Sequence, residues 1–360
     1  MYKAAILGAT GVVGQEFILA LQDHPWFSVT RLAASERSAG KLYKEALQDK
    51  NGSTRWYCSG APNKNIQNML VEDASKMDMA NIDVVFTAVE SEEARHLEPR
   101  FAAHKPVITT ASAFRYEEDV PIMIPGINSA HSGLIKKQRD RGWKGFIVPG
   151  PNCTTVGLAV SLKPIQQSFG LNQVIMTSMQ AVSGAGRDGG VLALDITDNV
   201  IPYIPSEEEK VQRETKKILG TLADGHIAPL DLALSCTCTR VNVRDAHLET
   251  VFVSTKKPCT PEEVKQAMIE YGKRISDNGW PSAPKELIVV LDDPFRPQPR
   301  VDRDTYDGMA VVVGRIERAT ALENGIKYVV LSHNLKLGAA KGAVLIGEQL
   351  AKEGYIKEAS

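Results

Sequence analysis

The first half of the chain alternates short apolar runs with glycine- or serine-rich turns and with stretches of helical spacing. The runs carry hydrophobic side chains at consecutive positions, which is typical of parallel strands covered on both faces. The pattern predicts strands at residues 4–7, 28–33, 83–89, 106–110 and 145–148, with connecting helices at 16–21 and 92–104. Strands and helices in this alternation predict a doubly wound, Rossmann-like α/β domain.

The pattern changes after residue 150 to longer strands whose apolar and polar positions alternate. We expect strands at 174–182, 233–243, 248–254 and 327–331, and helices at 156–162, 206–219 and 336–352. The second and third of these strands are expected to pair as a hairpin around the turn 244–246. Ser206 is a predicted N-cap, with Glu209 completing a capping box. These elements predict a second domain of the α+β class.

Composition and charge narrow the class of protein. The 360 residues include 42 basic and 43 acidic side chains, a balance that argues against a nucleic-acid-binding protein. No apolar run reaches the roughly 18 residues that a membrane span requires. The chain enters a strand and a glycine turn at once, so we expect no signal or transit peptide. A cytoplasmic location is therefore expected.

Five cysteines, at positions 58, 153, 236, 238 and 259, do not suggest a disulfide framework in a chain of this size. A reducing compartment fits this usage best. Cys236 and Cys238 share one face of a predicted strand, but no second cysteine pair or histidine cluster accompanies them. We interpret these two residues as packing and expect no metal.

The turn GATGVVG after the first predicted strand has the context of a phosphate-binding loop. Its glycines allow a tight turn, a close approach to a pyrophosphate and the packing of the helix on its strand. A plain tight turn is the alternative. We expect the cofactor to contact Gly8, Thr10, Gly11, Val12, Val13 and Gly14.

The end of the second predicted strand indicates which dinucleotide is bound. Glu36 suits a ribose 2′-hydroxyl, whereas Ser35, Arg37 and Ser38 suit a 2′-phosphate. Because three of these four side chains are compatible with a phosphate, the sequence favours NADP over NAD. The carboxyl ends of two further strands should line the same crevice, through Thr87, Ala88 and Ser112.

The stretch PGPNCTTV, residues 149–156, places Cys153 between an apolar strand and a helical stretch. Free amide groups and the positive end of the helix dipole meet there, so we expect the pKa of the thiol to be lowered. The same amides suit an oxyanion formed when the thiolate attacks a carbonyl. The alternative is a small buried hydrophobic residue, as many free cysteines are.

Other candidate side chains follow in the second half. Gln180, near a strand end, is suited to orient a substrate carbonyl, and the glycine-rich loop 183–190 allows a close approach to a ligand. Arg240 and His247 lie seven residues apart. A histidine near a thiol is the usual acid–base partner for cysteine chemistry, although one histidine among seven is more often structural.

These motifs together resemble aspartate-β-semialdehyde dehydrogenase, particularly the branch found in fungi and archaea. The shared features, in one order along the chain, are GATGVVG, GPNCTT, Gln180 before SGAG, E-x-x-K at 207–210 and R-x6-H at 240–247. The resemblance implies reversible reduction of β-aspartyl phosphate by NADPH to aspartate semialdehyde, with release of phosphate. It also implies a place in the biosynthesis of lysine, methionine and threonine.

The resemblance also implies roles for single residues. Cys153 would be the nucleophile, with His247 as general acid–base, Gln180 orienting the acyl intermediate and Asn152 placing the thiol. Arg240 would bind the α-carboxylate of the substrate, Glu207 (or its neighbour Glu208) the α-ammonium, and Arg115 and Lys210 the phosphate. Asn334 would contact the nicotinamide carboxamide, and Ser183 and Gly184 would lie at the cofactor.

By the same resemblance, the tail helix returns to the first domain. The expected domains are 1–150 with 335–360 for NADP binding, and 151–334 for catalysis and dimerisation, in a homodimer or homotetramer. The alternatives are a malonyl-CoA or N-acetylglutamyl-phosphate reductase on the same fold, or a catalytically inactive NADP-binding protein. A substrate without an ammonium group would leave Glu207 unpaired.

Overall fold

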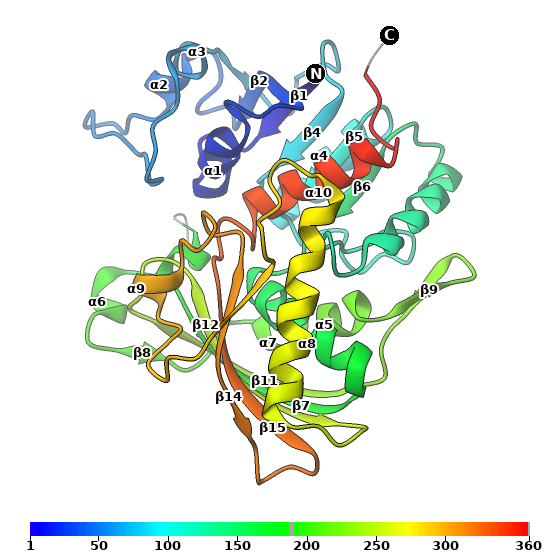
Figure 1. Cartoon of the computed structure of the whole chain (residues 1–360). Coiled ribbons are helices and arrows are strands. Elements are labelled where there is room, and N and C mark those ends of the chain that lie inside the picture. Colours follow the sequence, from blue (N-terminus) through cyan, green and yellow to red (C-terminus); the bar gives the residue numbers. More distant parts are fainter. Residues whose placement is uncertain (187–190, 359–360) are drawn as a thin grey trace.

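Two β-sheets, one above the other in Figure 1, organise the protein; the computed structural model describes residues 1–186 and 191–358. The first sheet has six parallel strands in the order β3-β2-β1-β4-β5-β6. They are β1 (Tyr2–Leu7), β2 (Phe27–Ala34), β3 (Val71–Asp73), β4 (Val84–Thr87), β5 (Pro106–Thr109) and β6 (Phe146–Pro149). This arrangement confirms the predicted doubly wound α/β fold.

Helices cover both faces of the first sheet. Along β1, Ala4 and Ile6 belong to one buried apolar cluster, and Ala5 and Leu7 to another. The helices are α1 (Val12–Leu21), α2 (Tyr43–Ala46), α3 (Lys64–Gln67), α4 (Ser91–Ala102) and α10 (Ala340–Lys352). Although α10 comes from the end of the chain, it packs against α1 and β5, as Figure 1 shows. The domain boundaries given above remain predictions.

The second sheet is mixed and has the order β13-β14-β15-β12-β7-β11-β8. Its strands are β7 (Leu171–Gln180), β8 (Val200–Ile201), β11 (Ala233–Val241), β12 (His247–Thr255), β13 (Ile288–Leu291), β14 (Val311–Arg318) and β15 (Gly325–Ser332). The predicted hairpin of β11 and β12 is wrong, because β7 lies between them and pairs with both. Two strands with alternating apolar and polar positions, joined by a short turn, have the same sequence pattern whether they pair with each other or with a third strand between them.

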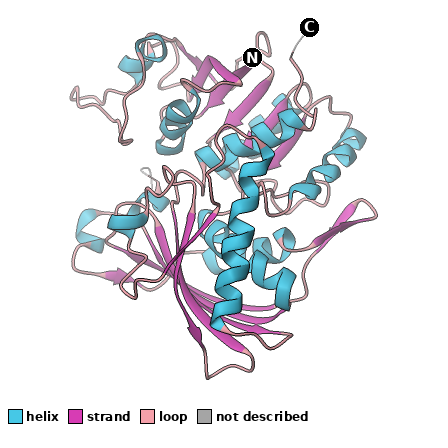
Figure 2. Cartoon of the chain, viewed as in Figure 1, coloured by secondary structure: helices cyan, strands magenta, loops and turns pink. Residues whose placement is uncertain are grey.

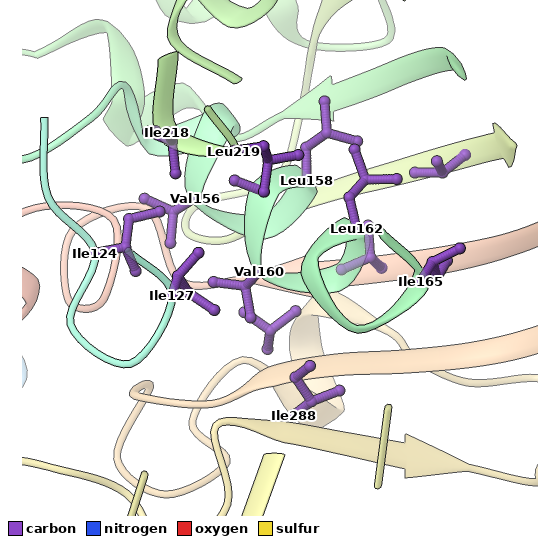
Figure 3. Close-up of a cluster of buried hydrophobic side chains, with 14 of the residues drawn as sticks. Ile124, Ile127, Val156, Leu158, Val160, Leu162, Ile165, Ile218, Leu219 and Ile288 are labelled. Carbon is purple, nitrogen blue, oxygen red and sulfur yellow. The ribbon is translucent and has the colours of Figure 1, made fainter. Parts of the chain in front are cut away.

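The helix after Cys153 is the centre of the larger core. It is α5 (Cys153–Phe169), and it packs against β12 and β15 and between α7 (Glu207–Ile218) and α8 (Pro261–Lys273). Figure 2 shows the long helix α8 running beside the strands of the second sheet. Figure 3 shows the apolar side chains of α5 meeting those of α7 and β13: Val156, Leu158, Val160, Leu162, Ile165, Ile218, Leu219 and Ile288.

The start of α7 differs from the prediction. Ser206 has a left-handed backbone, with φ of 59°, and its side chain makes no capping hydrogen bond, so the predicted capping box is wrong. A left-handed residue aims its side chain away from the first free amides of the helix. The remaining elements are α6 (Ala193–Ile196), α9 (Pro299–Asp302), the hairpin of β9 (Thr221–Ala223) and β10 (His226–Ala228), and 3₁₀ segments at Ser129–Arg141, Val182–Ala185 and Arg274–Asn278.

Candidate active site

The glycine loop after β1 brings the start of α1 close to the first sheet. Gly8 has a positive φ of 76°, and a Cβ there would lie 2.5 Å from the carbonyl oxygen of Ala88. A Cβ on Gly14 would lie 2.1 Å from the carbonyl oxygen of Gly8. No side chain fits at either position. The strand order reverses between β1 and β4, and the loop follows the carboxyl end of β1 at that point. This is where doubly wound sheets bind dinucleotides.

A cleft with about 990 Å³ of empty space joins this loop to Cys153. Eleven of the predicted site residues line it: Val12, Val13, Ala88, Ser112, Arg115, Asn152, Cys153, Ser183, Gly184, Lys210 and Asn334. Further lining residues, which no sequence pattern predicted, include Val89, Glu90, Ser91, Leu335, Gly338 and Ala339. They follow strand ends or precede α10. All but Glu90 have small or apolar side chains, which give no chemical signal, and Glu90 is the N-cap of α4 beside Glu92 and Glu93, where acids are common at a helix start.

Thr87 was predicted at the cofactor, but its side chain faces the other way. It is fully buried and its hydroxyl donates to Glu98 at 2.5 Å, so Ala88 and not Thr87 reaches the cleft. Ser35 and Arg37 are exposed at the carboxyl end of β2, while Ser38 is buried beside them. The last four residues of the predicted glycine-rich loop, 187–190, lie outside the described residues.

The register of the second sheet sets polar side chains in two rows beneath α5. Arg240 is paired with Gln180, and His247 with Ser332, so these four form the row nearest the cleft. Two residues further along β12, Glu249 belongs to the next row. The start of α5 crosses the first row, and the Sγ atom of Cys153 lies 3.1 Å from Nε2 of His247. Strand register therefore assembles residues that are far apart in the sequence.

The environment of the thiol differs from the prediction. Burial, and then the charge of Glu207, raise the pKa of Cys153 to about 12, although Arg240, Arg115 and the amide of Thr154 act in the opposite direction. Burial, and then the charge of Arg240, lower the pKa of His247 to about 3. The predicted lowering of the thiol pKa is therefore wrong for this state of the protein, because the loss of solvent outweighs the amides at the helix start.

Asn152 forms the N-cap of α5. Its side-chain oxygen accepts from the amides of Thr154 and Thr155, and its Nδ2 donates to Glu207 at 2.9 Å. Glu207 is thereby tied to the residue before the thiol. Glu208 instead accepts from the backbone amide of Cys238 at 3.0 Å, on β11. Of the two predicted acids, the structure brings Glu207 to the cysteine.

Arg115 is held by the protein itself. Its guanidinium donates to Glu214 at 3.0 Å and to the carbonyl oxygens of Gly150 and Thr110. Glu214 also accepts from the backbone amide of Asn152 at 2.6 Å. Glu214 was missed by the sequence analysis, yet it lies seven residues after Glu207, which is two turns along the same helix face.

The other predicted side chains surround the cysteine–histidine pair. Gln180 is 1% exposed, and its amide donates to Ser178 at 3.2 Å. Arg240 donates to the carbonyl oxygen of Ala181 at 2.8 Å. Asn334 accepts from the amide of Ala246 at 2.7 Å and donates to Ser183 at 2.9 Å. These contacts fix the side chains at the border between the cleft and the second sheet.

A parallel sheet with a nucleotide-type glycine loop and a second sheet covered by a helix that begins at Cys153 meet at one cleft, and this is the two-domain plan of the semialdehyde dehydrogenases. The chain matches the family models described as semialdehyde dehydrogenase, NAD binding domain, over residues 3–134, and semialdehyde dehydrogenase, dimerisation domain, over 162–337. In the described part of the chain, no helix is long and apolar enough to cross a membrane, and no group of His, Cys, Asp or Glu is arranged to hold a metal ion.

The chain belongs to the aspartate-semialdehyde dehydrogenase family. It is 45% identical to the enzyme of Archaeoglobus fulgidus and 41% identical to that of Aspergillus fumigatus, covering 98–99% of each chain. The Candida albicans enzyme, solved with NADP, superposes with a TM-score of 0.87 at 39% identity, covering 99% of this chain and 100% of that one. The predicted family and fold are thereby confirmed.

Proposed function

We propose that this protein catalyses the reversible, NADPH-dependent reduction of β-aspartyl phosphate to aspartate β-semialdehyde, with release of phosphate. The observation that carries this proposal is the Cys153–His247 pair, at the start of α5, on a cleft that begins at a nucleotide-type glycine loop. The names of the archaeal and fungal relatives support it, as does the NADP complex of the Candida enzyme.

The residues present fit the dinucleotide. The loop around Gly8 and Gly14 leaves no room for a Cβ, which is the cradle that a pyrophosphate needs. Val12, Val13, Ala88 and Ser112 would hold the cofactor along the cleft, with Ser35, Arg37 and Ser38 at a 2′-phosphate and Ser183, Gly184 and Asn334 at the nicotinamide. When bound in its reduced form, the cofactor supplies hydride.

The chain's own residues carry the acyl group. The sulfur of Cys153 attacks the acyl carbon, the C–S bond forms and the C–O bond to phosphate breaks. His247, whose Nε2 lies 3.1 Å from the sulfur, is the general acid–base, and Gln180 orients the acyl oxygen. Asn152 holds the first turn of α5 and with it the thiol. A thioester, unlike a carboxylate, does not repel hydride, which is why a cysteine is needed.

Four side chains are proposed to select the substrate. Arg240 binds the α-carboxylate, and Glu207 pairs with the α-ammonium while Glu208 holds the backbone of β11. Arg115 has five N–H groups; among the described residues three of them donate, to Glu214, Gly150 and Thr110, which leaves two for a phosphate. Lys210 lines the cleft and completes that phosphate site.

We further propose that two copies pair through the outer face of the second sheet, as the dimerisation-domain match supports. Ile175 and Phe252 are 47% and 36% exposed on neighbouring strands of this sheet. A dimer or a tetramer, a cytoplasmic location and a place in the biosynthesis of lysine, methionine and threonine complete the proposal. The five free cysteines suit a reducing compartment.

A spectrophotometric assay of NADP reduction by aspartate semialdehyde, with and without phosphate, tests the function. We expect turnover that requires phosphate and is abolished by Cys153→Ala but not by Cys58→Ala, a second partly exposed cysteine. Turnover of malonyl-CoA in place of this substrate would identify the alternative reductase. NADP binding with no turnover of either substrate would indicate the inactive alternative.

A further inference from the structure

Lys217, in the last turn of α7, holds the backbone of the segment that carries Arg115. This arginine segment, residues 111–120, follows β5. Nζ of Lys217 donates to three of its carbonyl oxygens, those of Arg115 at 2.8 Å, Glu117 at 2.9 Å and Val120 at 2.7 Å. An ammonium group has three N–H groups, and all three are used here. Lys217 therefore has no donor left for a substrate and can act only through the segment that it holds.

Arg115 is held by α7 at both of its ends. Its carbonyl oxygen accepts from Lys217, and its guanidinium donates at 3.0 Å to Glu214, which lies one turn earlier in the helix. The guanidinium of Arg213 also lies over the ring of Tyr116, with its central carbon 4.0 Å from the ring centroid. The position of Arg115 relative to α7 therefore depends on backbone and side-chain contacts together.

The same face of α7 reaches the rest of the proposed phosphate site. Four charged side chains, spaced three or four residues apart, lie along this face: Glu207, Lys210, Glu214 and Lys217. Lys210 lines the cleft, as Arg115 does. Arg115 follows a strand of the first sheet, whereas Lys210 is on a helix that packs against β11 of the second sheet.

We infer that Lys217 is a positioning residue for phosphate, because it ties the arginine segment to the helix that carries Lys210 and so fixes the separation of the two cations. The inference deepens the proposed function and rests on it for the identity of the anion. Phosphate is held best by cationic groups at a fixed separation. An error of about 1 Å in the position of such a group can cost about 100-fold in rate.

The step concerned is the exchange of sulfur for phosphate on the acyl group. In the direction of aspartate semialdehyde oxidation, a phosphate oxygen attacks the acyl carbon of the thioester on Cys153. The C–O bond forms, the C–S bond breaks, and its electron pair returns to sulfur. Only phosphate uses the two cations, so a loss of their separation should affect phosphate and not the other two substrates.

Steady-state kinetics of NADP reduction separates positioning from folding. Lys217→Met keeps the apolar stem of the side chain and removes all three donors. We expect the KM for phosphate to rise about 10- to 100-fold, with the KM values for NADP and aspartate semialdehyde nearly unchanged. Lys216→Met is the matched control, because the same replacement one residue earlier points away from the arginine segment, about 100° around the helix. An unchanged phosphate KM in Lys217→Met, or equal increases for all three substrates, would overturn the inference.

The protonation of Lys217 gives a second signature. Burial, and then the charge of Arg213, lower the pKa of Lys217 to about 8, although three carboxylates act in the opposite direction. The groups that face it from α7, from the arginine segment and from the 3₁₀ segment Ser129–Arg141 are Arg213 and Glu214, Glu117 and Asp119, and His131 and Arg141. A neutral amine has two N–H groups for three carbonyl oxygens, so one contact is lost as pH rises through about 8.

The wild-type KM for phosphate should therefore rise between about pH 7 and 9. In Lys217→Met it should be high and level over this range, whereas Lys216→Met should follow the wild type. If Lys217→Met does not fold, the wild-type profile decides by itself, and a level phosphate KM would overturn the inference.

Hydrogen exchange measures the hold of Lys217 without any substrate. Three amides of the arginine segment donate to carbonyl oxygens within it, those of Arg115, Glu117 and Val120. They should exchange faster in Lys217→Met near neutral pH, and at the wild-type rate in Lys216→Met. Unchanged exchange would reject the positioning role even if the phosphate KM were raised.

The exchange measurement also separates this inference from the proposed function. Failure of the activity assay would reject the proposed substrate and leave the exchange result standing, whereas an active enzyme with unchanged exchange would reject only the role of Lys217. Circular dichroism of each variant confirms that the fold is retained.

Discussion

Replacement of Glu214 by glutamine should remove both stability and activity, because this carboxylate connects three parts of the active site. Glu214 is fully buried on α7. One oxygen accepts from Arg115 at 3.0 Å and from the hydroxyl of Tyr116 at 3.2 Å, and the other accepts from the amide of Asn152 at 2.6 Å. All three partners are donors, so only a group with two acceptor oxygens satisfies them.

Glutamine has the same shape but only one acceptor oxygen. If that oxygen meets Arg115 and Tyr116, the NH₂ group opposes the amide of Asn152; if it meets Asn152, the NH₂ group opposes the guanidinium. Either way the buried charge of Arg115 loses its counter-ion. Breaking a buried ion pair on one side costs about 3–5 kcal/mol, a large part of the roughly 5–15 kcal/mol that stabilises a typical domain.

Urea denaturation of Glu214→Gln measures this loss, with Glu209→Gln as the matched control. Glu209 is an exposed residue of the same helix, so its replacement should change the free energy of unfolding by no more than about 0.5 kcal/mol. Turnover of Glu214→Gln should also fall, since the residue before Cys153 loses its anchor. A change in stability no larger than that of the control would refute the argument that Glu214 holds this site together.

Three further predictions follow from single contacts. Arg240→Lys should raise the KM for aspartate semialdehyde about 10- to 100-fold with NADP binding unchanged, since an ammonium cannot make a forked contact; an unchanged KM in steady-state kinetics would rule out the proposed role. Gly14→Ala should weaken NADP binding in a fluorescence titration, because the added methyl group would lie 2.1 Å from the carbonyl oxygen of Gly8. Wild-type affinity would contradict this steric argument. Burial raises the pKa of Glu249 well above its ordinary value, so the folded protein keeps a proton that the unfolded chain releases, and stability falls as pH rises above about 4.5. Glu249→Gln should remove that part of the decline in thermal melts between about pH 5 and 8, and parallel curves for the two proteins would argue against it.

Much of the fold could be predicted because its signals are local. Apolar runs followed by glycine turns predicted the strands of the first sheet, and the structure confirms β1, β2, β4, β5 and β6 within a few residues. β3 was missed, since three residues give no period to detect. Cys153 was also found locally, because Asn152 and the prolines around it indicate a turn into a helix.

Pairing between distant segments was not predictable in the same way. The second sheet places β7 between β11 and β12, and a hairpin pattern carries no information about an inserted strand. The partners of Arg115 show the same limit, since Glu214 lies 99 residues away in the chain. Its place on the buried face of α7 was visible in the spacing, but its partner was not.

By itself the sequence determined five of the six strands of the first sheet, the glycine loop at Gly8 and Gly14, and the identity of the reactive residues, because backbone conformation and side-chain chemistry are properties of short segments. Only the tertiary structure decided how those residues ionise and which of them meet. The pKa of Cys153 depends on how far folding removes it from water, and the place of His247 beside the sulfur depends on strand register, which also brings the amide of Ala181 to its Nδ1. Desolvation and register are properties of the packed sheet, and no short segment of the chain contains them.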